Sequence, residues 1–498
     1  MKDLSHSLFF IILLLSESIL TACTSSVFAP TASPNPWPDD YTAVASMENY
    51  RSWGTYNVHD PSCRKLGDYY YMYSTDAIYK ENRKEAEEKG VPLGFIQVRR
   101  SKDLVKWDFV GWAFPEIPQE AVQWVRSHAD GKGATNIWAP YIIPYKDKYR
   151  LYYCVSAFGR KTSYIGLAES ASPEGPWMQL GCVVKTDDTT AMNAIDPTVI
   201  IDPADGKWWM HYGSFFGGLY AVELNSETGL PVTENDKGHL IARRANYQHD
   251  NLEAPEIFYN PALKKYFLFV SYDPLMTTYN VRVGRSDSIA DNFVDYFGKE
   301  LKDTTNNFPI LTAPYRFAHH QGWAGTAHCG VFSADDGQTF MVHQARLAPQ
   351  NLMMDLHLRQ LFFTEDGWPV VSPERYAGTK PRKFVAADLE GEWEIIRIQE
   401  PLYERQLEAG QIMWGEGGLH KKEWNESSPL HLAAGGTLAE GGNWDFSKSK
   451  QLLSLTLGTE AIENLIVFAG HDWENETETV LFTGLDNRGR SVWGKRVK

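Results

Sequence analysis

Hydrophobic and polar positions alternate in short, aromatic-rich runs along most of the chain, a pattern that predicts β-strands. Five of these runs resemble one another: GDYYYMYST (67–75), KYRLYYCVS (148–156), GKWWMHYGS (206–214), KKYFLFVSY (264–272) and GQTFMVHQA (337–345). A shorter segment precedes each run: HDPSCRKL, WAPYIIPY, IDPTVIID, EAPEIFYN and, most divergent, AHCGVFSA. The pattern therefore predicts a repeated unit that begins with two strands joined by a turn.

Each repeat has room for two further strands, because successive copies start about sixty to eighty residues apart. Candidates are GFIQVRRS and WDFVGWAF after the first copy, SYIGLAES and MQLGCVVKT after the second, and YNVRVGRS after the fourth. A four-stranded repeat is the blade of a β-propeller. Five copies predict a five-bladed, all-β propeller, with the first strand of each blade nearest the central axis.

The remaining segments set the predicted domain boundaries. Residues 1–22 form a short apolar leader that is too short to span a membrane, and its end, LTAC, resembles the lipobox of bacterial lipoproteins. That resemblance implies a lipid on Cys23 and a protein anchored to the cell envelope; ordinary cleavage is the alternative. An extended tether (23–45), the propeller (46–378) and a smaller all-β, barrel- or sandwich-like domain (379–498) follow, the last ending in a hairpin around 486–489.

Composition narrows the ligand class. The chain has 17 Trp, 25 Tyr and 24 Phe, and its formal net charge is −15. An acidic, aromatic-rich protein disfavours nucleic acid and suits neutral ligands such as sugars, which stack on flat rings. The cysteines after Cys23 have no CxxC spacing, so they indicate no zinc site and are read either as disulfides or as buried free thiols: Cys63, Cys154, Cys182 and Cys329.

Three of the five repeats carry an acid at the start of the inner strand: Asp60 in HDP, Asp196 in IDP and Glu253 in EAP. A propeller would bring these acids together at one end of its channel. Each acid could merely cap a turn, since Asp before Pro is a common turn opener. Convergent carboxylates suit glycoside hydrolysis, in which one carboxyl protonates the leaving oxygen and another activates water. A divalent cation site is the rival interpretation.

The series VHDP, NIWAP, NAIDP, GSFFGG, LEAP and GTAHCGV, over residues 50 to 375, resembles glycoside hydrolase family 43. The resemblance implies that Asp60 is the general base, Glu253 the proton donor and Asp196 the acid that raises the donor's pKa, with inversion at the anomeric carbon. The stretches IPQEAVQWVRSHADGKGATNIWAP and LYYCVSAFGRKTSYIGLA are most similar to arabinan-cleaving members. The implied activity is endo-cleavage of α-1,5-linked L-arabinofuranose chains.

Other residues are weighed beside the acids. His328, placed where the other repeats have Pro, matches a histidine that helps to hold a calcium ion near the catalytic centre in the arabinanases. Arg359 lies on the strand expected to close the ring and either pairs with an acid or substrate or is an ordinary strand charge. The candidate substrate-binding residues are Trp138, Phe158, Asn136, Asn193 and Ser214.

Two alternatives stay open. One is an exo-acting α-L-arabinofuranosidase or β-xylosidase on the same scaffold, since endo or exo action depends on whether loops wall off one end of the cleft. A noncatalytic glycan-binding propeller is the alternative of another class, but a binding protein does not need all three acids. The sequence gives no indication of the oligomeric state.

Overall fold

The computed structural model describes residues 38–77, 80–245, 250–348, 353–400 and 423–497. By its internal contacts the chain divides into Met1–Pro34 and Asn35–Lys498, and only the second unit is described below. The predicted signal, lipobox and most of the tether lie outside the described residues. Within the described ranges, no helix is long and apolar enough to cross a membrane.

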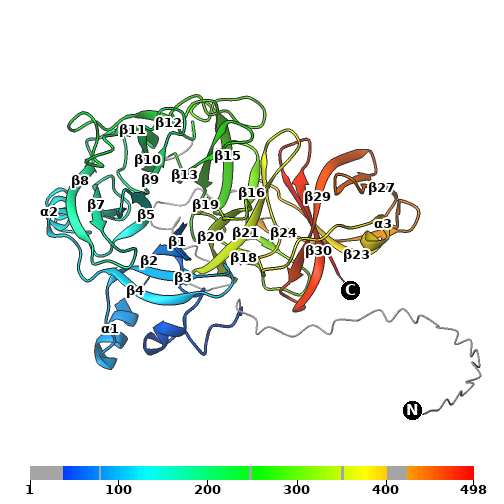
Figure 1. Ribbon diagram of the computed structural model, residues 1–498, viewed down its shortest axis with the longest axis horizontal. Coiled ribbons are helices and arrows are strands. Elements are labelled where there is room, and N and C mark those ends of the chain that lie inside the picture. The colour runs from blue at the N-terminus through cyan, green and yellow to red at the C-terminus, as the bar shows by residue number, and fades with distance from the viewer. Residues whose placement is uncertain (1–37, 78–79, 246–249, 349–352, 401–422, 498) are drawn as a thin grey trace, which may run out of the picture. The chain divides into compact units, whose positions relative to one another are not determined.

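Four repeats form antiparallel four-stranded sheets with strands in chain order (Figure 1). The first contains β1 (His59–Leu66), β2 (Tyr69–Thr75), β3 (Phe95–Ser101) and β4 (Asp108–Phe114). The second contains β5 (Trp138–Tyr145), β6 (Lys148–Ser156), β7 (Ser163–Ser170) and β8 (Met178–Thr186). The third contains β9 (Thr198–Ile201), β10 (Trp208–Ser214), β11 (Gly218–Leu224) and β12 (His239–Ala242). The fourth contains β13 (Leu252–Asn260), β14 (Lys265–Tyr272), β15 (Asn280–Ser286) and β16 (Ile310–Thr312).

The prediction of five four-stranded blades is wrong, because the fifth repeat is part of a seven-stranded sheet. Its strands are β17 (Tyr315–Arg316), β18 (Trp323–Ala324), β19 (Cys329–Ser333), β20 (Thr339–Leu347), β21 (Asp355–Phe363), β22 (Pro369–Val371) and β24 (Asn425–Glu426). The short β19 pairs only with Thr339–His343 of β20, and β18 takes the free edge at Arg346 and Leu347. β18 then pairs with β17, and β17 with β24. An uncovered strand edge is a liability, and these short strands cover it.

The inner strands share a backbone conformation near their first residues. In each repeat, the residue just before the Pro position, or before Cys329 in the fifth repeat, has a left-handed backbone conformation. These residues have φ between 44° and 56°: Asp60, Ala139, Asp196, Ala254 and His328. The pairing register shifts at this point in the first, second and fourth sheets. Proline cannot donate a ladder hydrogen bond, so it is accommodated in such bulges, which also turn the preceding side chains out of the strand pattern.

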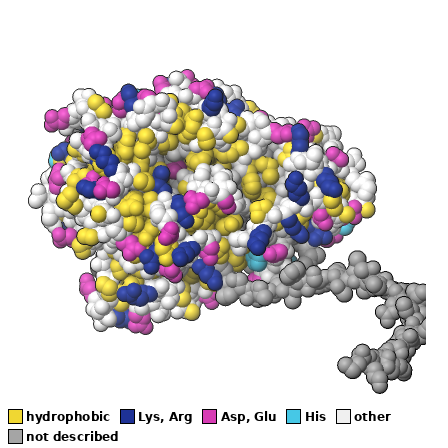
Figure 2. All heavy atoms as spheres, in the orientation of Figure 1, with side chains coloured by type: hydrophobic (Ala, Val, Ile, Leu, Met, Phe, Trp, Pro, Cys, Tyr) yellow, Lys and Arg dark blue, Asp and Glu magenta, His cyan; other side chains and the backbone are white. Residues whose placement is uncertain are grey.

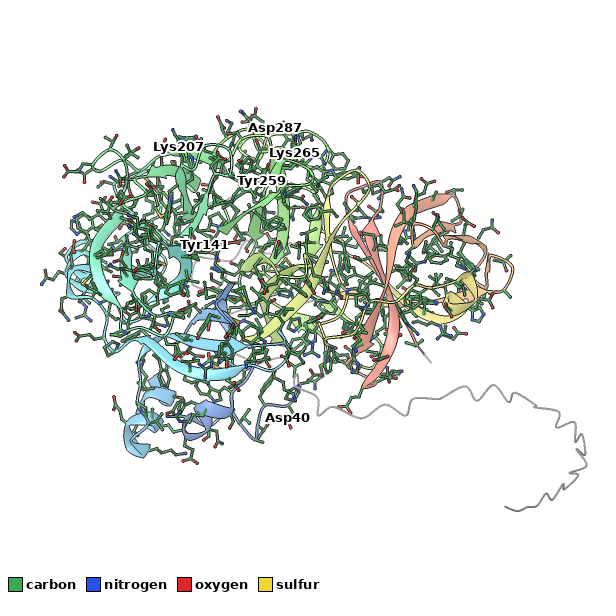
Figure 3. All side chains as sticks on the ribbon, in the orientation of Figure 1. Asp40, Tyr141, Lys207, Tyr259, Lys265 and Asp287 are labelled. Carbon is green, nitrogen blue, oxygen red and sulfur yellow. The ribbon has the colours of Figure 1, made fainter. Side chains whose placement is uncertain are left out.

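Below the level of the acids, one residue from each inner strand joins a series of polar contacts that forms an open ring around the axis, here called the polar ring. Arg64 Nη2 donates to Tyr141 Oη (2.9 Å), Tyr141 is hydrogen-bonded to Thr198, and Thr198 Oγ1 donates to Glu256 Oε2 (3.0 Å). Glu256 Oε1 accepts from the backbone N–H of Val331 (3.0 Å). Figure 3 shows Tyr141 toward the middle of the ring of sheets, whereas Lys265 and Asp287 lie at its edge. The ring ties all five inner strands together beneath the predicted acids.

The C-terminal region is a closed eight-stranded barrel, as one of the two predicted forms proposed. Its strands are β23 (Gly391–Arg397), β25 (Ser428–Ala433), β26 (Thr437–Leu438), β27 (Gly442–Ser447), β28 (Leu452–Leu457), β29 (Glu460–Asp472), β30 (Thr477–Leu485) and β31 (Ser491–Arg496). Apolar side chains from these strands, together with Phe384 and Leu389, fill the interior. The predicted hairpin at 486–489 is confirmed, since Gly489 N–H bonds to the carbonyl of Asp486 between β30 and β31.

Three α-helices and one 3₁₀-helix occur in the described ranges: η1 (Met47–Ser52), α1 (Lys80–Lys89), α2 (Gln119–His128) and α3 (Ala386–Leu389). The helix α1, rich in charged residues, lies between β2 and β3 of the first repeat, and α2 lies between β4 and β5. Figure 2 shows acidic and basic side chains interspersed over the visible face, without a region of one charge sign. The described cysteines are all free thiols: Cys63, Cys154, Cys182 and Cys329.

Candidate active site

Asp60 is held at the bulge of β1 by groups from several strands. Its backbone N–H donates to Gln344 Oε1 (3.0 Å) on β20. His328 Nδ1 lies 2.7 Å and His59 Nε2 3.1 Å from Oδ1, while Thr75 Oγ1 donates to Oδ2 (2.7 Å). A carboxylate offers about four acceptor positions. Three are used here, and one remains for a water molecule.

Glu253 stands on β13 with both carboxyl oxygens hydrogen-bonded. Tyr279 Oη donates to Oε1 (2.7 Å), and Ser214 Oγ donates to Oε2 (2.9 Å). Burial raises the pKa of Glu253, with Asp60 adding to the rise, against the opposing effects of Tyr279, His328 and Ser214. Glu253 is therefore suited to hold a proton when Asp60 is ionised.

Asp196 interacts electrostatically with both of the other acids. Its Oδ2 accepts from the backbone N–H of Ala254 (3.2 Å), which ties it to the residue beside Glu253. Burial raises its pKa well above the usual range, and the neighbouring charges of Glu253 and Asp60 add to this effect. Two buried carboxyl groups this strongly linked favour a state in which one of them keeps a proton.

The ionisation of Asp60 depends mainly on His328. Burial opposes it, but the charge of His328 and the bonds from His328 and Thr75 hold the pKa of Asp60 well below its usual range. Burial also lowers the pKa of His59 to about 4, so His59 is neutral near pH 7 and adds little. For His328, the effect of burial is outweighed by Asp60, Asp196 and Glu253, which raise its pKa to about 9.

The backbone conformations show that the three acids and His328 do not all occupy equivalent positions in their repeats. Asp60, Asp196 and His328 occupy the same left-handed position, whereas Ala254 occupies it in the fourth repeat. Glu253 is therefore one residue earlier in the repeat than the two aspartates, in the place that Trp138 holds in the second repeat. Cys329, and not His328, stands where the other repeats have Pro.

A small cavity lies on the axis between the acids and the polar ring. The volume open to the centre of a water molecule is about 20 Å³. The walls include Asp60, Asp196, Glu256 and His328. Burial raises the pKa of Glu256 to about 7. The cavity is thus polar and has room for one water or one small ion.

The chain is similar to known protein families over both of its folded regions. The model of glycosyl hydrolases family 43 matches residues 54–369, which include the acids, His328 and all five inner strands. The chain belongs to glycosyl hydrolase family 43. It is a glycoside hydrolase, and a second model, a C-terminal lipocalin-like domain found with this family, matches residues 373–494.

Individual relatives cover most of this family 43 chain. It is 28% identical over 487 residues to an extracellular endo-α-(1→5)-L-arabinanase of Thermotoga petrophila, covering 89% of this chain and 94% of the relative. The crystal structure of an endo-1,5-α-L-arabinanase from T. petrophila superposes with a TM-score of 0.73 at 26% identity, covering 89% and 99%. An extracellular exo-α-(1→5)-L-arabinofuranosidase of Cellvibrio japonicus is 31% identical over 336 residues, covering 63% of this chain and 86% of the relative.

The remaining predicted site residues of this family 43 enzyme fall into two groups. Ser214 contacts Glu253, and the exposed Phe158, 57% accessible, packs edge-on against Trp138 with ring centroids 6.4 Å apart. These rings form an accessible aromatic pair at the second repeat.

The other three make structural contacts. Asn136 Nδ2 donates to the backbone carbonyl of Asp76 (2.7 Å), and Asn193 Oδ1 accepts from Ser163 (2.6 Å). Arg359 is fully buried and is hydrogen-bonded to His343, His357, Tyr315 and the carbonyls of Ser372 and Pro373. The proposed pairing of Arg359 with a catalytic acid or substrate is therefore not what the described contacts show.

The sequence analysis missed four residues that contact the acids: His59, Thr75, Tyr279 and Gln344. His59 had a signal, because it stands directly before Asp60 in HDP. Thr75 ends the aromatic strand that pairs with β1, so strand pairing could have placed it near His59. Gln344 lies on β20, in another sheet than Asp60, and Tyr279 lies in the loop between β14 and β15 of the sheet that carries Glu253; neither has a signal in its local sequence.

Proposed function

We propose that this protein is an endo-acting arabinanase that hydrolyses internal α-1,5-L-arabinofuranosidic bonds with inversion. The observation that carries the proposal is the pairing of an ionised Asp60 with a Glu253 that favours its protonated form at the start of the inner strands. The full-length similarity to an endo-arabinanase, across both domains, supports endo action over exo action.

In the proposed mechanism, Glu253 is the general acid and Asp60 the general base. Glu253 gives its proton to the glycosidic oxygen as the bond to the anomeric carbon breaks. Asp60 takes a proton from the water that attacks this carbon from the opposite face. His328 and Thr75 keep Asp60 ionised and oriented, and Asp196 raises the pKa of Glu253 while it carries a negative charge. Phe158 and Trp138 would stack on the sugar rings.

The test is the product profile over time when the protein lacking residues 1–22 acts on debranched linear arabinan. A mixture of oligosaccharides early in the reaction is expected, and Glu253→Gln should remove it because the amide has no proton to give. Proton NMR of the first product should show the anomer of opposite configuration. Arabinose alone from the start would favour the exo enzyme, and the absence of any product would refute the proposal.

We also propose that a calcium ion binds in the axial cavity. The donor chemistry fits once His328 loses the proton of its other ring nitrogen: Nδ1 stays on Asp60, the other nitrogen is then open to a ligand, and Asp196 and Glu256 supply carboxyl oxygens in the cavity wall. Waters would complete the shell, since Ca²⁺ prefers oxygen ligands. When bound, the ion supplies positive charge that stabilises the ionised Asp60.

Calcium binding can be measured directly. Isothermal titration with CaCl₂ after chelation should give one site, and the ion should raise the melting temperature. His328→Ala should abolish the binding heat, whereas His431→Ala, at an exposed barrel position, should leave it unchanged. Binding that survives in His328→Ala would refute this assignment.

The lipid anchor is a further proposal, supported by the LTAC sequence that ends at Cys23. We propose that the protein is secreted and held by a lipid at the outer membrane or cell surface of a bacterium. Labelled palmitate should enter the wild-type chain in a bacterial host, and not the Cys23→Ala variant. Equal labelling of the two chains would refute the anchor.

A further inference from the structure

The hydroxyl of Tyr279 touches the proposed proton donor, yet the mechanism above gives it no role. Tyr279 Oη lies 2.7 Å from Glu253 Oε1, and the side chain is 1% exposed. Its ring belongs to the apolar cluster that contains Phe267, Phe269 and Val281. A polar group at the edge of such a cluster is fixed in direction, because the ring cannot rotate away without opening the core.

The backbone around Tyr279 is fixed as well. Its N–H donates to the carbonyl of Pro274 (3.1 Å), and its own carbonyl accepts from Thr326 Oγ1 (3.4 Å). Two residues earlier, the carbonyl of Thr277 accepts from Gly325 N–H (2.9 Å). The segment is therefore tied to the start of the fifth repeat, and the hydroxyl stays beside Oε1.

The two oxygens of Glu253 thus have different partners. A phenol has a single proton, and Tyr279 donates it to Oε1. Burial and the charges of Glu253 and Asp196 raise the pKa of Tyr279 well above its usual range, so its hydroxyl keeps its proton throughout the working range, and Glu253 Oε1 is the acceptor that the described contacts give this proton. A protonated carboxyl carries its proton on one oxygen, and the other oxygen is an acceptor. Because Oε1 is the acceptor, the proton belongs on Oε2.

Ser214 lies at Oε2, and its hydroxyl can either donate or accept by rotating. It can donate to Oε2 when Glu253 is ionised, and it can accept from Oε2 when that oxygen is protonated. The pair of hydroxyls therefore treats the two states of Glu253 differently, with one fixed donor and one adjustable partner.

We propose that Tyr279 is a positioning residue that selects Oε2 as the oxygen from which Glu253 delivers its proton to the leaving sugar. The inference rests on the proposed function. The proton moves from Oε2 to the glycosidic oxygen, which keeps the electron pair of the broken bond. The attacking water adds its oxygen to the anomeric carbon and gives a proton to Asp60. Glu253 is left as a carboxylate that accepts hydrogen bonds from both Tyr279 and Ser214.

Loss of the phenol hydroxyl has a directional consequence. Burial raises the pKa of Glu253, and the bond from Tyr279 is the largest opposing effect. The other charges facing Glu253 are Asp60, Asp196 and His328, and all three remain in a Tyr279→Phe variant. Without the hydroxyl, the pKa of Glu253 rises further, and its proton is free to occupy either oxygen.

The test compares Tyr279→Phe with Tyr212→Phe in the otherwise intact chain. Tyr212 is also fully buried and donates one hydrogen bond (2.7 Å), but to the carbonyl of Lys237. On linear arabinan, Tyr279→Phe should lower kcat about 10- to 100-fold with little change in KM, as expected for one lost bond to a charged group. The alkaline limb of its kcat profile should move to higher pH. Tyr212→Phe should leave that limb in place.

A second substrate separates positioning from misfolding. An aryl arabinofuranoside with a very acidic leaving phenol needs no proton from Glu253, so Tyr279→Phe should cleave it at close to the wild-type rate. Loss of both activities, or an alkaline limb identical to that of Tyr212→Phe, would overturn the inference alone if the wild-type chain cleaves arabinan. A wild-type chain that leaves arabinan intact would instead overturn the proposed function, and this inference with it.

Discussion

At the scale of single residues, Asp60 shows how a base is kept ionised in a buried site. Its carboxylate has lost most of its water and receives hydrogen bonds from Thr75 and His328 instead. Thr75 has two tasks, because its oxygen also accepts from the backbone N–H of Ala139 (2.8 Å) on the neighbouring sheet. One hydroxyl thus joins the base to the second repeat.

Thr75→Val should therefore damage both activity and stability. The valine has the same shape but offers no donor to Asp60 and no acceptor to Ala139. We expect kcat/KM to fall about 10- to 100-fold and the free energy of unfolding to fall by about 1–3 kcal/mol. Steady-state kinetics and urea unfolding measure the two effects. Thr75→Ser keeps the hydroxyl and should stay close to wild type; an equally damaged serine variant would contradict this account.

The pH dependence of the reaction follows from the same two carboxyl groups. Asp60 must be ionised, and its lowered pKa meets this condition from acidic pH upward. Glu253 must be protonated, and its raised pKa meets that condition until the pH passes through it. We expect kcat/KM to be greatest in the mildly acidic to neutral range and to decline as alkaline conditions deprotonate Glu253. A rate that keeps rising at alkaline pH would contradict the assignment of Glu253 as the acid.

The three acids were predictable because each lies within a repeated local motif beside Pro. Their partners were not, since Gln344 reaches Asp60 from another sheet, Tyr279 reaches Glu253 from the loop before β15, and neither stands out in the local sequence. The position of Glu253 was predicted to within one residue, because spacing along the chain does not show which residue adopts the left-handed conformation.

At the scale of elements, the polar ring beneath the acids couples the inner strands. Glu256 is its only acid, and it is buried between Thr198 and the N–H of Val331. Because Asp196 lies two residues before Thr198, and His328 three before Val331, the ring fixes the strands that carry the site. The carboxyl group of Glu256 is therefore buried away from water.

Glu256→Gln should make the stability of the protein less dependent on pH. Burial raises the pKa of Glu256 from 4.5 to about 7, so the folded chain holds a proton that the unfolded chain releases. This contribution is complete below about pH 4.5 and is lost as the pH rises through about 7. Between about pH 5 and pH 8, wild type should lose about 2–3 kcal/mol more stability than Glu256→Gln.

Urea unfolding at a series of pH values measures this difference, with Glu227→Gln as the matched control. Glu227 is exposed and pairs with Lys146 at the surface. Parallel pH curves for wild type and Glu256→Gln would show that Glu256 does not titrate in this range.

The inner strands and their hairpin partners were predictable from periodicity and repetition, whereas the seven-stranded sheet was not. β17, β18 and β24 have two residues each, too short for an alternating pattern. They form because β20 is longer than β19 and leaves an edge to be covered. That condition depends on the length of a neighbour and not on the sequence of the short strands.

At the scale of the whole molecule, the barrel and the seven-stranded sheet share a buried junction. Trp493, Ile396 and Ile398 from the barrel region pack into the apolar cluster of the fourth and fifth repeats. Trp473 Nε1 donates to the carbonyl of Arg375 (2.9 Å), and Thr483 Oγ1 donates to that of Val371 (2.8 Å). The parallel pairing of β17 with β24 adds main-chain bonds. Through these contacts the barrel packs directly against the repeats that carry the site.

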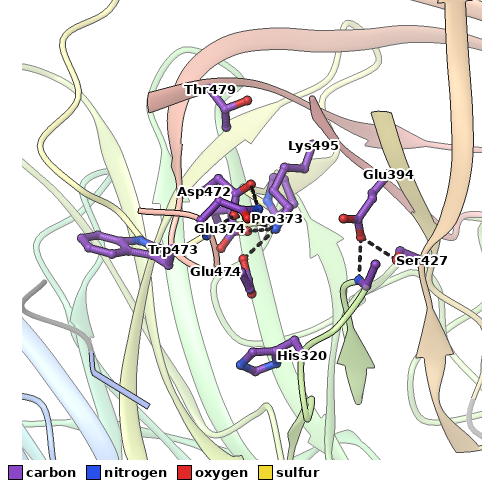
Figure 4. Close-up of polar contacts among 12 residues, drawn as sticks. His320, Pro373, Glu374, Glu394, Ser427, Asp472, Trp473, Glu474, Thr479 and Lys495 are labelled. Atoms are coloured by element: carbon purple, nitrogen blue, oxygen red, sulfur yellow. Dashed lines mark hydrogen bonds and ion pairs between the residues drawn. The ribbon is translucent and has the colours of Figure 1, made fainter. Parts of the chain in front are cut away.

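A charged cluster lies within this junction (Figure 4). Lys495 Nζ is 2.9 Å from Glu374, 3.1 Å from Asp472 and 2.6 Å from Glu474. These three acids could in principle hold a metal ion, but the ammonium already lies among them. Burial and the charge of Glu474 raise the pKa of Glu374 well above its usual range, so Glu374 keeps a proton and shares it with Glu474. Lys495 then offsets one of the two charges that remain, those of Asp472 and Glu474.

Lys495→Met should therefore destabilise the protein far more than the loss of an exposed ion pair. The methionine fills similar volume but leaves Asp472 and Glu474 buried without their cation, which should cost about 3–5 kcal/mol. Lys450→Met is the control, since Lys450 and Glu365 form a pair (2.6 Å) with 59% and 48% of their side chains exposed. It should change stability by less than about 1 kcal/mol. Urea unfolding followed by tryptophan fluorescence compares the two, because Trp473 and Trp493 lie at the junction. If Lys495→Met proved as mild as Lys450→Met, the barrel would be held by its apolar contacts, and the charged cluster would add no net stability.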